Sequence, residues 1–366
     1  MASTPVILDW QADKLRAWML SPGASPRPVI LDENETVLPL VISMAERRLQ
    51  LGKSGYKLIR LQPQQVMECF VPHLGMDRSW QYRRHTLESR DGFALVLQKI
   101  KDKLPGKSVL HIVPSYWNRE QAALLEDQTR QAGLRSLGSI KRGLVLSGLS
   151  PGLVVDVDAF AATITQNRLQ SRSGGLQYEH TQTLTDLAIP IWSERIAGLV
   201  ASRCLQDYRR DPRANAETDQ QLYEQIQRKL PDWASQQDAR IHLKQQDWQD
   251  DLPMNASDVQ AVCSPLANRL AQYIVAKKES ESWFLSPEAG SLPGLPQALY
   301  QASMNQRSIS VLPLELMPMA LTNWACHIEQ GLLQPPHLAE TMPAISEIPA
   351  EHQPDTLPFL KKPSRK

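Results

Sequence analysis

The chain has 366 residues, which is enough for two or more domains with sizeable cores. Its formal net charge is +1, and neither sign of charge gathers in a block or stripe, so nucleic acid and anionic membrane surfaces are poor partner candidates. No apolar run approaches the length of a membrane span, and the first residues lack a signal-peptide pattern. We therefore expect a cytoplasmic protein without a membrane span.

The four cysteines, Cys69, Cys204, Cys263 and Cys326, are scattered singly. Their spacing matches neither a metal site nor a disulfide framework. All four lie in apolar patterns of helical spacing, which predicts buried free thiols and no metal centre.

Strands dominate the predicted start of the chain, and helices follow. The elements expected in the first hundred residues are strands at 5–10 and 15–20, a turn at 23–28, strands at 29–31 and 37–43, helices at 64–74 and 92–104, and a surface loop at 78–90. This order suits a mixed sheet better than a Rossmann unit.

The stretch 109–170 organises the chain, because it reads as strand, helix, strand and hairpin. The elements expected from there onward are strands at 109–113, 134–140, 153–157, 161–170, 239–243 and 283–285, and helices at 119–131, 186–209, 218–230, 256–276 and 314–331. Pro231 is expected to end the helix that precedes it.

Residues 332–366 are rich in proline and are expected to form a disordered tail. The apolar run Leu357-Pro358-Phe359-Leu360 within it is a candidate partner motif, although a solubilising tail is the simpler interpretation.

Two motifs carry a resemblance to a known family. The run Val113-Pro114-Ser115-Tyr116-Trp117-Asn118, followed by a helix and by Ala132-Gly133-Leu134, resembles the ATPase domain of DnaK-type heat-shock chaperones, which belong to the actin-like ATPase superfamily. The resemblance extends unevenly from about residue 5 to residue 331. It implies an α/β, actin-like ATPase fold with two lobes, each a mixed β-sheet flanked by helices. The family's substrate-binding domain is expected to have no counterpart in these 366 residues.

The implied boundaries divide the chain into three parts. Residues 1–150 form a first lobe, with a ribonuclease-H-like subdomain and an insertion. Residues 151–331 form a second lobe, with a second ribonuclease-H-like subdomain and a helical insertion around 184–250. Residues 332–366 are the tail.

The phosphate loops of the family are degenerate in this chain. Where the family has Asp-Leu-Gly-Thr-Thr, residues 9–13 read Asp-Trp-Gln-Ala-Asp, and where it has Asp-Leu-Gly-Gly-Gly-Thr-x-Asp, residues 156–163 read Asp-Val-Asp-Ala-Phe-Ala-Ala-Thr. Within these two loops, only Asp9 and Asp156 remain as candidate nucleotide-binding residues. Side chains at glycine positions obstruct the close backbone approach to phosphate. The residues expected to block the cleft are Trp10, Asp158, Phe160 and Glu288.

Other nucleotide contacts are also replaced. Arg142 stands where the family has a Glu that helps to place the metal-bound water, and a cation cannot accept that hydrogen bond. Tyr56 stands at the position where the family has a lysine that contacts the transferred phosphate. The nearest lysine in this chain, Lys57, comes one residue after that position. Glu224 and Arg228 match two of the four positions that hold adenosine, but a solvated i,i+4 pair explains them equally well.

Two hypotheses follow. The first is a DnaK-like pseudo-ATPase that acts as a protein-interaction or scaffold module, with no confident catalytic residue, no expected cofactor and a protein partner. The alternative is a divergent ATPase in which Asp9 and Asp156 hold Mg²⁺-ATP through water. A non-nucleotide enzyme has less support, because the histidines are isolated and His111 reads as a core residue. The sequence does not indicate the oligomeric state.

Overall fold

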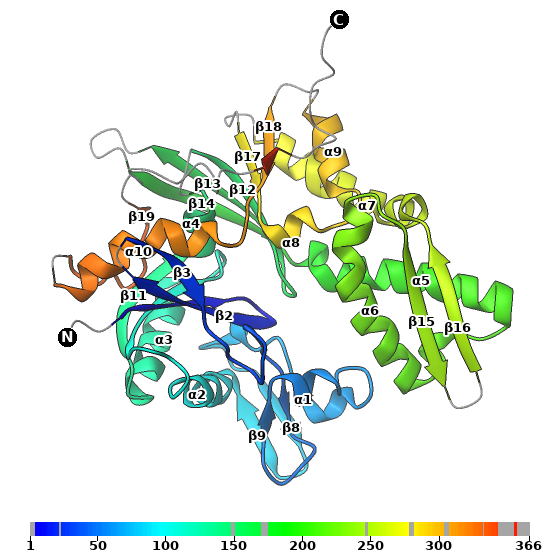
Figure 1. The fold of residues 1–366 in the computed structure, drawn as a ribbon, viewed down its shortest axis with the longest axis horizontal. Coiled ribbons are helices and arrows are strands. Elements are labelled where there is room, and N and C mark those ends of the chain that lie inside the picture. The colour runs from blue at the N-terminus through cyan, green and yellow to red at the C-terminus, as the bar shows by residue number, and fades with distance from the viewer. Residues whose placement is uncertain are drawn as a thin grey trace, which may run out of the picture.

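The computed structural model describes residues 4–21, 23–147, 151–169, 175–245, 248–277, 282–303, 307–331, 333–342 and 355–356. The fold is α/β, with two large mixed sheets that are flanked by helices (Figure 1). We call residues 4–147 the first half and residues 151–331 the second half. Among the described residues, none of the helices is both long and apolar enough to cross a membrane.

The first sheet has the strand order β11-β10-β1-β2-β3, with β4 also paired to β2. Its strands are β1 (Val6–Trp10), β2 (Lys14–Ser21), β3 (Ala24–Pro28), β4 (Val37–Pro39), β10 (Ser108–Val113) and β11 (Arg135–Lys141). Strands β1, β2 and β3 form an antiparallel meander, and β10 and β11 run parallel to β1. The turn predicted at 23–28 is wrong, since β3 lies there, and its two prolines are tolerated because β3 is an edge strand.

The second sheet has the order β19-β14-β13-β12-β17-β18-β20. Its main strands are β12 (Gly152–Val157), β13 (Ala162–Leu169), β14 (Leu176–Leu184), β17 (Ser282–Leu285) and β18 (Ser308–Val311). The first three are again an antiparallel meander, and the last two are parallel to β12. The five-strand core of the first sheet is thus repeated, and Asp9 and Asp156 are both the next-to-last residue of the first strand of a repeat.

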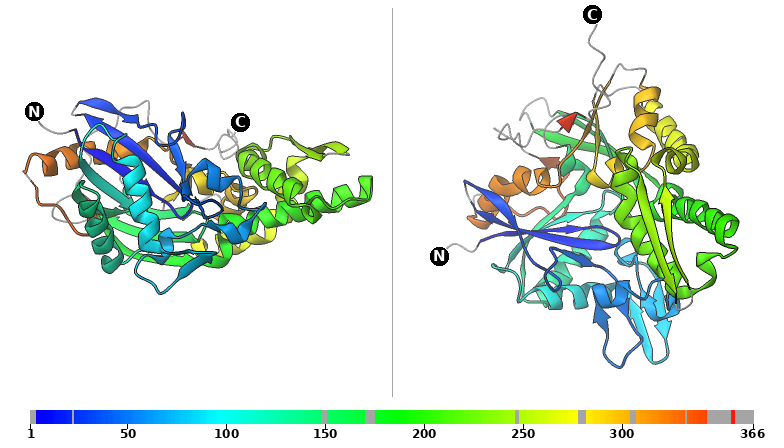
Figure 2. Two further views of the ribbon diagram at one scale, coloured as in Figure 1. Left: turned by 90° about the horizontal axis from the view of Figure 1, so that it is seen from below. Right: turned by 45° about the vertical axis from the view of Figure 1, so that its right-hand side comes forward.

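Helices cover both sheets and fill the space between them (Figure 2). In the first half, α2 (Ser89–Ile100) and α3 (Arg119–Gln131) pack on a core that contains Trp10, Phe93 and Trp117. The bounds of α3 agree with the prediction, because Asn118 and Gln121 exchange side-chain to backbone hydrogen bonds in a capping box. A second core between the two sheets receives side chains from α4 (Arg142–Leu146) and α10 (Leu316–Glu329).

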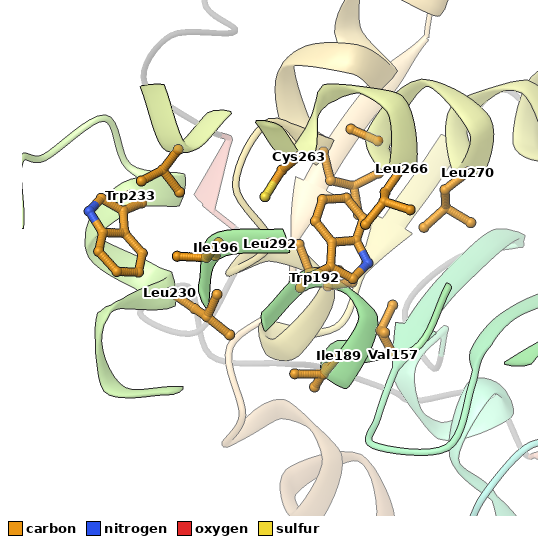
Figure 3. Close-up of a cluster of buried hydrophobic side chains, with 14 of the residues drawn as sticks. Val157, Ile189, Trp192, Ile196, Leu230, Trp233, Cys263, Leu266, Leu270 and Leu292 are labelled. Carbon is orange, nitrogen blue, oxygen red and sulfur yellow. The ribbon is translucent and has the colours of Figure 1, made fainter. Parts of the chain in front are cut away.

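The second half continues into a helical part beside the sheets. It consists of α5 (Ile189–Tyr208), α6 (Ala216–Ala234), α7 (Ala256–Val275), α8 (Pro287–Gly290), α9 (Leu295–Ala302) and the hairpin β15 (Ala239–Gln245) and β16 (Trp248–Met254). Figure 3 shows Trp192 and Trp233 among the apolar side chains of its core. Pro231 does not end α6 as predicted, because the helix continues to place Trp233, which is fully buried, in that core. Burial of this side chain offsets the cost of about 3 kcal/mol for a proline inside a helix.

Two further predictions in the first half are wrong. The helix predicted at 64–74 is replaced by two 3₁₀ turns, Pro63–Gln65 and Val71–His73, around the short strand β7 (Val66–Met67). Its apolar residues are buried by these turns instead of by a helix face. The loop predicted at 78–90 is largely a hairpin, formed by β8 (Ser79–Tyr82) and β9 (His85–Glu88).

The small remaining elements of the first half are α1 (Lys53–Tyr56), β5 (Ile42–Ser43) and β6 (Gln50–Leu51). All four cysteines are free thiols, and Cys204, Cys263 and Cys326 are buried in helices as predicted. Cys69 is not helical: it is half-buried and has a φ of 50°.

The prediction of a disordered tail from residue 332 onward is wrong for residues 333–342. Leu338, Ala339 and Met342 are buried, and β19 (Thr341–Met342) extends the edge of β14. The chain touches both sheets here, because Ala339 N donates to Ser139 O at 2.7 Å and Tyr178 N donates to Glu340 O at 2.8 Å. Farther on, β20 (Asp355–Thr356) pairs with β18, while residues 343–354 and 357–366 lie outside the described part.

Candidate functional site

The two turns that correspond to the degenerate loops, β1–β2 and β12–β13, meet at the boundary between the halves. Arg142, the first residue of α4, lies between them with only 1% of its surface exposed. Its guanidinium forms ion pairs with Asp9, with Asp156 (Nε to Oδ2, 3.0 Å) and with Glu288 (Nη2 to Oε2, 2.9 Å). One cation thus joins both repeats, because Asp9 belongs to the first sheet and the other two carboxylates to the second half.

Glu288 extends this network through its other carboxylate oxygen. Oε1 lies 3.0 Å from Arg16 Nη1 and 3.2 Å from Lys14 Nζ, and it accepts a hydrogen bond from Gln11 Nε2 at 3.2 Å. The turn between β1 and β2 is therefore held to α8 by several charged contacts. We call the six charged side chains Lys14, Arg16, Arg142, Asp9, Asp156 and Glu288 the Arg142 network. Three positive and three negative groups balance within it.

Arg142 and Glu288 of the network keep their charges in spite of burial. Burial by itself would lower the pKa of Arg142, but the carboxylates of Asp156, Asp9 and Glu288 raise it well above its ordinary value. Burial likewise opposes ionisation of Glu288, yet Lys14, Arg142 and Arg16 hold its pKa well below the usual range. For Asp156 burial is the larger effect, and its pKa is raised although Arg142 opposes the shift.

Asp158 ties the two turns together in a second way. Its Oδ1 accepts hydrogen bonds from the backbone N–H groups of Phe160 at 2.8 Å and Ala161 at 2.9 Å. Its Oδ2 accepts from the Ala12 N–H at 3.3 Å and from the Tyr116 hydroxyl at 2.9 Å. The carboxylate thus takes up backbone donors of both turns, as a bound anion would. Burial, reinforced by the charge on Asp156, raises its pKa to about 7, although the backbone hydrogen bonds act in the opposite direction.

Phe160 and Trp10, both expected in the cleft, lie in different places. The ring of Phe160 crosses to the first half, where its centroid lies 5.1 Å from that of Tyr116 and 5.7 Å from that of His73. Trp10 is instead turned into the first-half core, with its ring centroid 4.9 Å from that of Phe93. The expectation that Trp10 blocks the cleft rested on its position beside the loop, and that position did not determine which way its side chain points.

His111 explains the direction of Trp10. Trp10 Nε1 donates to His111 Nδ1 at 3.1 Å, so the ring proton of the neutral imidazole is on Nε2, which lies 3.1 Å from Thr129 Oγ1. The Thr129 hydroxyl donates in turn to Leu125 O at 2.7 Å. Burial lowers the pKa of His111 to about 3. His111 is therefore a satisfied core residue, as predicted.

The predicted adenosine-site pair on α6 lies where that helix meets the first half, but other side chains make the contact. Gln220 Oε1 accepts from Arg60 N at 2.8 Å, and Gln220 Nε2 donates to Tyr56 O at 3.1 Å. Tyr223 places its ring centroid 5.8 Å from that of Tyr56. Glu224 accepts a hydrogen bond from Gln220, and Arg228 Nε donates to the Glu224 carbonyl at 3.3 Å.

No protein-family model matches the chain, and no curated protein matches it.

The residues of the site do not fit a magnesium–triphosphate group. Asp9 and Asp156, which would hold the metal through water, share the guanidinium of Arg142. The backbone N–H groups that would face phosphate are bonded to Asp158. A second anion would therefore meet carboxylates and occupied donors.

Several site residues were not identified from the sequence. Lys14, Arg16, Tyr116 and Gln220 each contribute contacts across the site or between the halves. Arg16 had a detectable signal, since it is the cross-strand partner of Asp9 in the β1–β2 hairpin. Gln220 had none, because its partners across the boundary between the halves are backbone atoms more than 150 residues away in sequence.

Proposed function

We propose that the protein is a pseudo-ATPase of the actin-like, DnaK-type architecture that works in the cytoplasm as a protein-interaction module and has lost nucleotide binding. The observation that carries the proposal is the internal replacement of both parts of the ligand. Arg142 provides a fixed cation between Asp9 and Asp156, and the carboxyl group of Asp158 provides fixed acceptors for the hydrogen-bond donors of the two turns.

The strand order supports the architectural part of the proposal. The resemblance implies a ribonuclease-H-like subdomain in each lobe, and the two sheets repeat one five-strand order with the same directions. The degenerate loops occupy equivalent turns of the two repeats, with one aspartate conserved in position in each. This placement is what a duplicated phosphate-binding cleft requires, and it does not depend on the loop residues themselves.

The chemistry of phosphoryl transfer supports the functional part. That reaction depends on a positioned metal and on preorganised backbone donors. A metal would have to displace a guanidinium that is paired with three buried carboxylates. An intramolecular carboxylate also competes at an effective concentration that a free ligand rarely matches. A folded protein that does not bind nucleotide can still bind another protein through its outer surface.

A protein partner is supported by the exposed side of α5. Ile191, Leu205 and Tyr208 of this helix are each about two-fifths exposed. Large apolar and aromatic side chains on an exposed surface are typical of protein–protein interfaces. The contacts of Gln220 and Tyr223 close the α6 side of the boundary, which leaves outer faces such as this one accessible.

Thermal unfolding with increasing Mg²⁺-ATP tests the loss of nucleotide binding. A ligand at a hundred times its Kd adds about 2.7 kcal/mol to the stability of the native state, which is readily measured. We expect no saturable shift in Tm for the natural chain. An Asp158→Gly variant titrated in parallel reports whether this carboxylate excludes the nucleotide. A saturable upward shift with the unmodified protein would overturn the proposal.

The interaction part is tested separately by affinity capture with the full chain. Leu205→Asp on the exposed side of α5 is expected to reduce recovery of a specific partner by at least about tenfold. Leu124→Asp is the matched control, because Leu124 is exposed to a similar degree on α3, away from α5. Equal recovery with both variants would place the interface elsewhere.

A further inference from the structure

A groove of about 660 Å³ lies between α7 and α9, on the second half of the molecule. Ala271, Val275, Ala298 and Ala302 provide apolar walls. The amide side chains at its border are Asn268, Gln272 and Gln301. Small apolar walls with an amide border suit one large apolar side chain on an extended peptide better than a charged ligand. None of the residues that line the groove belongs to the Arg142 network, so the proposal for its occupant does not rest on the proposed function.

The tail strand β20 shows which segment of the chain comes to this end of the molecule. It pairs antiparallel with β18, with Val311 opposite Asp355 and Ser310 opposite Thr356. The direction of pairing takes the chain that follows Thr356 toward the beginning of β18 at Ser308. The beginnings of β17 and β18 are also where α7 and α9 end, since these helices directly precede the two strands. Figure 1 shows α9 beside β18 and α7 at this end of the second sheet.

The residues that follow β20 have the chemistry that the groove would accept. They are Leu357, Pro358, Phe359 and Leu360, and two lysines come next. Phe359 is the third residue after Thr356, and three extended residues reach roughly 10–11 Å, which is comparable with the diameter of about 10–12 Å of a helix. Pro358 favours an extended backbone for the residue before it.

We propose that residues 357–360 bind in the α7–α9 groove of their own chain, with Phe359 as the apolar anchor. Pairing through two residues of β20 is a weak attachment by itself. Because it holds the chain near the groove, it gives Phe359 a high effective concentration there. The groove and the β18 edge together then form one continuous peptide-binding surface that the tail covers in cis.

Photo-crosslinking in the full-length protein tests the contact. Phe359 is replaced by benzoylphenylalanine, and the crosslinked peptides are identified by mass spectrometry. We expect crosslinks to residues 268–276 or 298–302 within one molecule. Ile345, an apolar tail residue before β20, is the matched control position and is expected to give none there. Crosslinks from position 359 only to other regions, only between molecules, or not at all would overturn the proposal.

Hydrogen exchange gives a second measurement that needs no probe residue. Phe359→Asp in the full chain is expected to raise amide exchange in α9 by about tenfold, because an anchored peptide protects the helix that it covers. Ile345→Asp is the control and should leave α9 unchanged. Identical exchange in α9 for the Phe359→Asp variant and the natural chain would contradict the binding of this segment.

Discussion

Removal of the Arg142 guanidinium is the most direct test of the network at the boundary. Arg142→Met keeps much of the side-chain volume but leaves the carboxylates of Asp9, Asp156 and Glu288 buried without their shared cation. Breaking a buried ion pair from one side costs roughly 3–5 kcal/mol. The remaining cations, Lys14 and Arg16, lie against Glu288 and compensate only part of this loss.

The expected cost corresponds to a clear change in thermal unfolding. At roughly 2–3 °C per kcal/mol for a chain of this size, Tm falls by about 6–15 °C. Arg130→Met is the control, because Arg130 pairs with Asp127 at 2.7 Å with both side chains exposed, and exposed pairs contribute about 1 kcal/mol or less. A loss below about 1 kcal/mol for Arg142→Met would refute the assignment of this residue as the central cation.

The same variant should acquire a characteristic pH dependence. Burial already raises the pKa of Asp156 in the natural protein, and loss of Arg142 removes the main opposing charge. A carboxylate whose folded-state pKa is raised favours the folded state at low pH, and this contribution is lost as the pH rises through that pKa. The deficit of Arg142→Met measured by urea unfolding should therefore be larger at pH 8 than at pH 5. Equal deficits at both values would contradict the electrostatic explanation.

Three further predictions concern single contacts. Asp158 has a pKa of about 7 in the folded state, well above the ordinary value for an aspartate. The stability of the natural chain relative to Asp158→Asn should therefore fall by roughly 2 kcal/mol between pH 5 and pH 7 in urea unfolding, and a constant difference would contradict this. Trp10→Phe removes the donor to His111 Nδ1 and should cost about 1–3 kcal/mol in the same assay, whereas an unchanged midpoint would show that this hydrogen bond is unimportant. A Cβ added at Gly138, where φ is +104°, would lie 2.2 Å from Pro336 O, so Gly138→Ala should speed proteolysis of the 333–342 segment, and equal cleavage rates would exclude that contact as its anchor.

Local patterns were sufficient for many of the elements. The helix at 119–131 is set by its cap and its apolar spacing, and the first strand of each meander, β1 or β12, is a short apolar run that ends beside a turn. The failures share a cause. At 64–74 and at Pro231, the backbone conformation depends on the core in which Phe70 or Trp233 is buried. That core is formed by residues distant in sequence, so a local pattern does not reveal it.

The candidate site divides in the same way. The sequence placed Asp9 and Asp156 at strand ends and showed that residues 9–13 and 156–163 contain no glycine, because both are properties of short segments. Residue patterns alone did not show that the two segments are equivalent turns of a repeated sheet, since the repeat is a matter of strand order and the sequences of the two halves differ.

By itself, therefore, the sequence determined the α/β character, most strands and helices, and the absence of glycine from residues 9–13 and 156–163. The tertiary structure alone decided which side chains these two turns meet. Arg142 meets Asp9 across 133 residues and Glu288 across 146, and Asp158 meets Ala12 across the same boundary. Periodicity and residue type determine whether a side chain is buried, but only the packing of the two halves determines which charges it meets there.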